Sequence, residues 1–165
     1  MSGKELSAAE WPVIPLKKYA TFSGRAPRAE YWWFYLATVI GSFAVKLVDK
    51  LAGDLGIFDA IYSIALIVPQ IAVTVRRLHD TDRSGRWLFI LAVPLAFVAA
   101  TGIGEGAMPG TLSSGPMLIG AVVLGIGFMI GAVTLLVFSV QPGTDGPNRY
   151  GDDPYGPDQL EEVFA

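Results

Sequence analysis

Residues 76–87 read Arg76-Arg77-Leu78-His79-Asp80-Thr81-Asp82-Arg83-Ser84-Gly85-Arg86-Trp87 and lie between two long apolar runs. This stretch holds four of the seven arginines in the 165-residue chain and its only histidine. Apolar residues make up 52% of the sequence and charged residues 16%, against about 25% charged residues in an average soluble domain. A charged stretch between apolar runs predicts a membrane protein in which residues 76–86 form a loop between two transmembrane helices.

Four apolar blocks follow one another along the chain: Tyr31–Val48, Ile57–Val75, Trp87–Thr101 and Met117–Val140. A helix needs about 20 mostly apolar residues to cross a bilayer, and the first, second and fourth blocks meet that requirement. The third block is shorter, has Pro94 in its middle, and reaches spanning length only when it is extended to Gly104. We therefore predict an all-α, polytopic membrane protein with about four transmembrane helices.

The N-terminal segment, residues 1–30, mixes apolar and aromatic side chains with Lys17 and Lys18. This mixture is typical of a short interfacial helix that lies on the membrane surface. Because Pro12 and Pro15 interrupt the segment, only its later part is expected to be helical. No signal-peptide cleavage site precedes the first apolar run, so the first transmembrane helix is expected to be an uncleaved anchor.

The remaining chain divides into two further parts. Residues 31–140 form the predicted transmembrane domain, which includes the loop 76–86 and a Gly-rich external loop at 102–116. Residues 141–165 form a tail whose glycines, prolines and Asx residues predict successive turns.

Lysine and arginine are distributed unevenly among these segments. Ten of the twelve lie in the N-terminal segment, the loop 76–86 or the tail, and only Lys46 and Lys50 lie between the first two helices. Cytoplasmic loops of membrane proteins carry an excess of Lys and Arg. We therefore predict a multi-pass protein with both termini and the loop 76–86 in the cytoplasm.

Three motifs lie on this predicted cytoplasmic side: GRAPRAEYWW at 24–33, the stretch 76–87, and GTDGPNRYGDDP at 143–154. In this order, and separated by apolar runs, they resemble the bacterial inner-membrane family called domain of unknown function 805. The resemblance covers roughly residues 16–154 and implies a small polytopic protein of the bacterial inner membrane. It brings no established activity, cofactor or catalytic residue. Because residues 87–140 form a longer stretch than in typical members, the number of helices is not carried over from shorter relatives.

All seven arginines, and none of the five lysines, lie in these motifs. A guanidinium group makes planar, multi-donor hydrogen bonds to carboxylates and phosphates, which an ammonium group cannot reproduce. We therefore predict a cytoplasmic cap in which the three motifs are joined through pairs of arginines with carboxylates. The candidate residues are Arg25, Arg28, Glu30, Arg76, Arg77, His79, Asp80, Asp82, Arg83, Arg86, Asn148 and Arg149.

Other roles stay open beside this cap. Arginines that it does not use would bind anionic lipid headgroups. His79, oriented by Asp80 or Asp82, would serve as an acid or base in a membrane enzyme, or the three residues would supply part of a metal site. A small channel or transporter would require oligomerisation, because no ionisable residue lies near the centre of any apolar block.

The preferred hypothesis is an integral inner-membrane protein that acts as a structural, adaptor or assembly component. No catalytic residue, metal ligand or cofactor is assigned, and an enzyme is the less favoured alternative. The expected partners are membrane lipids, including anionic headgroups, and a second copy of the chain or another membrane protein. Nucleic acid is not expected, because the basic residues lie beside the bilayer and alternate with acidic ones.

Overall fold

The computed structural model describes residues 10–91 and 115–154. Every regular element in these two ranges is helical, so the all-α prediction is confirmed. Three of the described helices contain stretches long and apolar enough to cross a membrane, at Arg28–Leu51, Ile57–Asp80 and Ile119–Val140. The predicted third span, residues 87–104, falls outside the described residues except for its first few positions.

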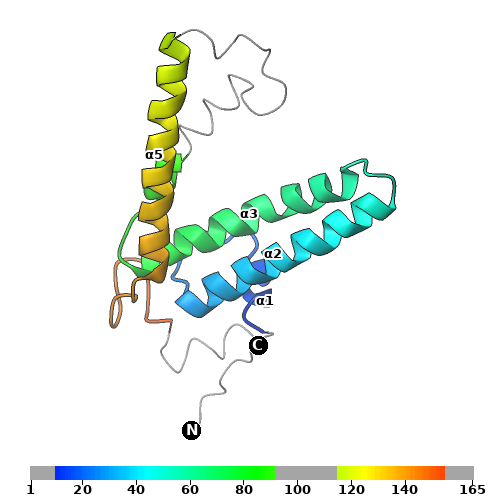
Figure 1. Ribbon diagram of the computed structural model, residues 1–165. Coiled ribbons are helices and arrows are strands. Elements are labelled where there is room, and N and C mark those ends of the chain that lie inside the picture. Colours follow the sequence, from blue (N-terminus) through cyan, green and yellow to red (C-terminus); the bar gives the residue numbers. More distant parts are fainter. Residues whose placement is uncertain (1–9, 92–114, 155–165) are drawn as a thin grey trace. The chain divides into compact units, whose positions relative to one another are not determined.

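Helices α2 (Arg28–Leu51) and α3 (Ile57–Asp80) pack side by side as an antiparallel hairpin (Figure 1). Gly41 of α2 brings the two helices close together, because a Cβ at this position would collide with the side chain of Tyr62. The Tyr62 hydroxyl donates a hydrogen bond of 2.9 Å to the carbonyl of Thr38. The absence of a side chain at one position of α2 therefore creates the space for a polar contact between the two helices.

The connection between α2 and α3 is closed by Asp49, a buried residue of the last turns of α2. Its carboxylate accepts hydrogen bonds from the backbone N–H groups of Phe58 at 3.2 Å and Asp59 at 2.6 Å. These N–H groups belong to the first turn of α3, where they have no partner within the helix. Gly53 and Gly56 have positive φ angles of 106° and 68°, which favour glycine and reverse the chain direction. Asp49 thus caps α3 from the preceding helix and fixes the register of the hairpin.

The N-terminal helix is α1 (Val13–Lys17), and it contacts both α2 and α3. The expectation that only the later part of this segment is helical is wrong, because the helix begins directly after Pro12 and includes Pro15. Both prolines lie at the start of the helix, where a backbone N–H would have no partner within the helix, so a missing N–H costs no hydrogen bond. The interfacial position of α1 stays a prediction.

Tyr19, just after α1, completes the hydrogen bonding of α3. Pro69 lies inside α3 and has no N–H to donate to the carbonyl of Ala65, four residues earlier. The Tyr19 hydroxyl donates to this carbonyl at 2.5 Å. An unsatisfied carbonyl is costly in hydrocarbon, and this hydrogen bond removes that cost. It also joins the N-terminal segment to α3 at one defined place.

Residues Arg86–Val140 belong to a second compact unit that contains α5 (Gly115–Val140). Within this unit Trp87 meets Phe138 edge to face, with 5.3 Å between the ring centroids. Gly131 of α5 is buried against Leu91, whose side chain would lie 3.1 Å from an added Cβ. The tail that follows α5 belongs to the first unit, together with α1, α2 and α3.

Candidate functional site

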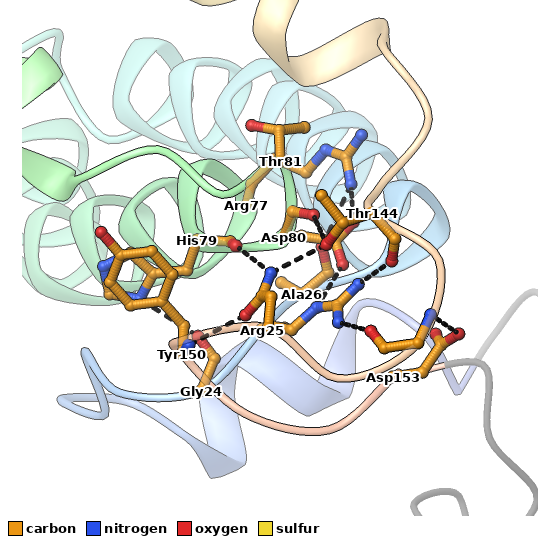
Figure 2. Close-up of polar contacts among 12 residues, drawn as sticks. Gly24, Arg25, Ala26, Arg77, His79, Asp80, Thr81, Thr144, Tyr150 and Asp153 are labelled. Carbon is orange, nitrogen blue, oxygen red and sulfur yellow. Dashed lines mark hydrogen bonds and ion pairs between the residues drawn. The ribbon is translucent and has the colours of Figure 1, made fainter.

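The three sequence motifs meet where α2 begins and α3 ends (Figure 2). The segment before α2 supplies Arg25, the last turn of α3 supplies Arg77 and Asp80, and the tail supplies Thr144. We call this assembly the polar cap and define it as residues 24–26, 77–82 and 141–150. All of it lies within the first compact unit.

Asp80 is the centre of the polar cap and is fully buried, with 0% of its surface exposed. One carboxylate oxygen, Oδ1, accepts a hydrogen bond of 2.9 Å from Nε of Arg25. The other, Oδ2, accepts a hydrogen bond from Nη1 of Arg77. Both guanidinium groups are themselves buried. Buried charges require partners of opposite charge and further hydrogen bonds, and Asp80 supplies one carboxylate for two cations.

Backbone carbonyls supply the further hydrogen bonds that the two arginines need. Arg25 donates through Nη1 to the carbonyl of Gly146 at 2.5 Å and through Nη2 to that of Thr144 at 2.6 Å. Arg77 donates through Nη2 to the carbonyl of Gln141. Each guanidinium therefore bridges Asp80 and the tail. A lysine ammonium has no planar fork of donors, which explains why arginine is found at both positions.

Main-chain contacts complete the junction between α3 and the tail. The Thr144 N–H donates to the carbonyl of Asp80 at 2.9 Å, and Asn148 donates through Nδ2 to the carbonyl of His79 at 2.9 Å. These carbonyls belong to the last turn of α3 and have no partner within the helix. Gly143 passes so close to Asp80 that a Cβ on this glycine would overlap the carboxylate. The tail thus caps the C-terminus of α3.

His79 lies at the half-buried edge of the polar cap. Its Nδ1 is 3.1 Å from the carbonyl oxygen of Gly24. Because a carbonyl only accepts hydrogen bonds, Nδ1 carries a proton here. The imidazole ring stacks on Tyr150 with 3.8 Å between centroids. Both contacts hold the ring in place between the N-terminal motif and the tail.

Asp82 and Arg149 form the outer rim of the polar cap. Nε of Arg149 lies 3.0 Å from Oδ1 of Asp82, and the two side chains are 60% and 47% exposed. Arg149 also donates to the Asp82 carbonyl at 2.6 Å and lies 4.9 Å from the ring centroid of Tyr150. An ion pair this exposed contributes about 0–1 kcal/mol to stability. The rim is therefore a weakly coupled, solvent-facing part of the cap.

Glu30 and Arg76 form a second buried ion pair, in which Nη1 of Arg76 donates to Oε1 of Glu30. It joins the first turn of α2 to α3. The Nε and Nη2 atoms of Arg76 are buried and have no hydrogen-bond partner among the described residues. The backbone carbonyl of Arg76 accepts from the N–H of Ala26 at 3.0 Å, which places this pair directly beside the polar cap.

The other predicted arginines lie outside these buried contacts. Arg28 is the exposed first residue of α2, Arg83 donates to the Thr81 carbonyl at 3.3 Å, and Arg86 lies in the 3₁₀ helix η1 (Gly85–Leu88). The structure thus brings together candidates from all three motifs, but Arg28, Arg83 and Arg86 do not take part in the buried ion pairs.

Several contributors to the polar cap were not predicted from sequence. Gln141, Thr144 and Gly146 act mainly through their backbone carbonyls, which every residue type possesses. Side-chain chemistry could not identify them. Tyr150 lies next to Arg149 in the third sequence motif, and this position was the one available signal, because His79, on which it stacks, is distant in the sequence.

The catalytic and metal-site hypotheses both depended on His79 together with Asp80 or Asp82. In the structure both carboxylates pair with arginines, and Nδ1 of His79 contacts the carbonyl of Gly24. Within residues 10–91 and 115–154, no group of three or more His, Cys, Asp or Glu side chains is arranged to hold a metal ion. The chemistry that this arrangement offers is charge compensation and hydrogen bonding.

Comparison with known proteins places this architecture in a family. The family described as "Protein of unknown function (DUF805)" matches residues 19–152. Inner membrane protein YhaH of Escherichia coli strain K12 is 35% identical over 150 residues, which cover 88% of this chain and 96% of YhaH. Inner membrane protein YhaI of the same strain is 34% identical over 146 residues, covering 88% of this chain and 95% of YhaI.

No solved structure matches the chain. The family match extends from the N-terminal motif into the tail, and the relatives are aligned over nearly their whole length. The chain therefore belongs to the DUF805 family, and its relatives YhaH and YhaI are inner membrane proteins.

Proposed function

We propose that this protein is a multi-pass structural component of the inner membrane that assembles with a second copy of itself or with another membrane protein. Its polar cap and both termini face the cytoplasm. The support for this orientation is the excess of Lys and Arg in the segments on the cap side, since such an excess marks cytoplasmic loops.

The observation that carries the proposal is the environment of Asp80. Both carboxylate oxygens accept hydrogen bonds from arginines, and these arginines also donate hydrogen bonds to carbonyls of the tail. A carboxylate and two guanidinium groups that are paired in this way hold the three motifs together and are not available to bind a substrate. What the cap presents outward is its rim, Asp82 and Arg149, which is a polar surface with a defined backbone beneath it.

Residues 87–104 make a fourth crossing in this proposal. The support is the position of two helix ends. α3 ends in the polar cap, and the tail that enters the same cap directly follows α5, so both helices end on the same side of the membrane in this proposal. If α5 crosses the membrane towards the cap, its first residue lies on the opposite side. The chain between α3 and α5 must then cross once.

A reporter enzyme fused at Gly110 tests this topology. We expect periplasmic activity at Gly110 and cytoplasmic activity for a fusion after Ala165, because an odd number of crossings separates the two positions. Cytoplasmic activity at Gly110 would contradict the fourth crossing. The fusion after Ala165 serves as the control for expression and membrane insertion.

The assembly role is tested by native mass spectrometry of gently extracted protein. We expect the wild type to retain a second copy or a membrane-protein partner at a fixed ratio. Arg149→Glu should release it, because this change places two acidic side chains together on the rim, while the folded yield changes little for so exposed a pair. A wild type that is monomeric and free of partners when its lipids are retained would count against an assembly role.

A further inference from the structure

The uncharged middle of α3 gives a scale of depth in the membrane. Asp59 and Arg76 are the charged residues nearest to it, and residues 60–75 between them carry no charged side chain. At a rise of 1.5 Å per residue this stretch is about 24 Å long, which is most of the roughly 30 Å hydrocarbon core of a bilayer. In the proposed multi-pass protein α3 crosses the membrane, so residues 60–75 lie in hydrocarbon.

Tyr19 reaches this uncharged stretch from the N-terminal segment. Its hydroxyl donates to the carbonyl of Ala65 at 2.5 Å, and Ala65 lies about 16 Å from Arg76 along the helix axis. Further along the chain, the N–H of Ala26 donates to the carbonyl of Arg76 at 3.0 Å. The N-terminal segment is therefore level with the charged end of α3 at Ala26, and the Tyr19 side chain reaches well into the hydrocarbon.

The N-terminal segment also carries a row of exposed apolar and aromatic side chains. They recur at every third position, their exposed fractions range from 41% to 47%, and we call them the N-terminal stripe: Val13, Leu16, Tyr19 and Phe22. Ile14 and Pro15 are buried, and α1 contacts both α2 and α3. One side of residues 13–22 thus packs on the helical hairpin, and the N-terminal stripe lies on the exposed side.

The surface of α3 at the same depth shows what covers the N-terminal stripe. Ile64 and Ile67 lie on either side of Ala65 in the sequence and are 67% and 53% exposed, and Ile71 is 44% exposed. These side chains face hydrocarbon when α3 crosses the membrane. A position of Tyr19 in water would place the Ala65 carbonyl, and with it this row of isoleucines, in water as well, at a large hydrophobic cost. Acyl chains are therefore the surroundings of Tyr19 that agree with the exposed surface of α3.

We infer that residues 13–22 are anchored in one leaflet of the bilayer, where the N-terminal stripe contacts lipid acyl chains. The partner is hydrocarbon and not a headgroup, because the one polar side-chain atom of the stripe, the Tyr19 hydroxyl, is bonded to Ala65. An interfacial helix buries its apolar face about 5–10 Å into the boundary between headgroups and acyl chains. The Tyr19 hydroxyl lies deeper, about 16 Å below Arg76 along α3.

The anchor connects the lipid to the polar cap. Only Ser23 and Gly24 separate the N-terminal stripe from Arg25, whose guanidinium is bonded to Asp80. The inference rests on the crossing of the membrane by α3, which belongs to the proposed function, but it uses no residue of the rim. The leaflet is the cytoplasmic one in the proposed orientation.

Spin labels on single cysteines test the depth, because the chain has no cysteine of its own. Leu16→Cys, Ile64→Cys and the matched control Asp152→Cys are labelled in the full chain and reconstituted into vesicles of phosphatidylglycerol and phosphatidylethanolamine. Oxygen concentrates in hydrocarbon and a nickel chelate stays in water, so the ratio of their collision rates with the label reports depth. We expect a high oxygen-to-nickel ratio at positions 16 and 64, and a ratio several-fold lower at 152, an exposed position of the tail.

The three positions separate failure of the anchor from failure of the proposed function. Hydrocarbon at position 64 together with water at position 16 would overturn the anchor and leave the crossing of α3 intact. Water at position 64 would contradict the crossing and the anchor together. Val13→Cys, at the start of α1, repeats the measurement on a second residue of the N-terminal stripe and is expected to give the same high ratio, so the result does not depend on the folding of one variant.

Discussion

Replacing Asp80 with asparagine is expected to destabilise the protein by about 3–5 kcal/mol, because removal of one partner leaves buried charges uncompensated. Arg25 and Arg77 would both lose their carboxylate while remaining buried. An asparagine amide has one carbonyl oxygen and cannot accept from both guanidinium groups in the same way. Thermal unfolding in detergent and the monodisperse fraction on size-exclusion chromatography measure the loss.

The matched control is Asp82→Asn, the same chemical change two residues along the chain. Asp82 pairs with Arg149 at the solvent-exposed rim, so its neutralisation is expected to cost no more than about 1 kcal/mol. Its backbone has a φ of 54°, a left-handed conformation that asparagine also tolerates. Equal losses for the two variants would show that burial of the Asp80 carboxylate is not what stabilises the junction.

Replacing Tyr19 with phenylalanine is expected to cost about 1–3 kcal/mol, because the carbonyl of Ala65 then has no donor. The change removes only a hydroxyl and leaves the aromatic ring to pack as before. Reversible unfolding of the purified protein in detergent, compared with the wild type under the same conditions, measures the difference in the free energy of unfolding.

A second substitution separates this hydrogen bond from other effects of the hydroxyl. Pro69→Ala restores an N–H within α3 that can donate to the Ala65 carbonyl. In that background Tyr19→Phe is expected to cost much less, and the difference between the two backgrounds is the coupling energy of the pair. Equal costs in both backgrounds would contradict the link between Tyr19 and Pro69.

The helices were the most predictable part of the fold, because an apolar run of spanning length reads directly as a helix. The blocks Tyr31–Val48 and Ile57–Val75 correspond to α2 and α3. Both helices extend beyond the apolar residues into the charged motifs, as far as Arg28 and Asp80. Hydrophobicity could not locate those ends, since they depend on capping and ion pairing with distant segments.

The pairing within the polar cap was predictable only as a set of residue types. Exclusive use of arginine in three motifs indicated carboxylate or carbonyl partners, and Arg25, Arg77 and Asp80 do meet. Their specific pairing depends on where the tail folds back, and the tail contributes mainly carbonyls, which carry no sequence signal. The start of α1 was missed for a different reason. A proline argues against a helix unless it lies in the first turn, and the sequence alone did not show that Pro12 and Pro15 lie there.

The bond between Arg25 and the carbonyl of Gly146 joins positions 121 residues apart. During translation Arg25 leaves the ribosome long before Gly146 has been made, and its buried site stays incomplete until the last apolar helix has also been synthesised. A prematurely terminated chain would carry cations beside the bilayer without their acceptors and would remain open to membrane proteases. The polar cap therefore closes only after Gly146 has been synthesised, and chains that end before this residue are expected to be short-lived.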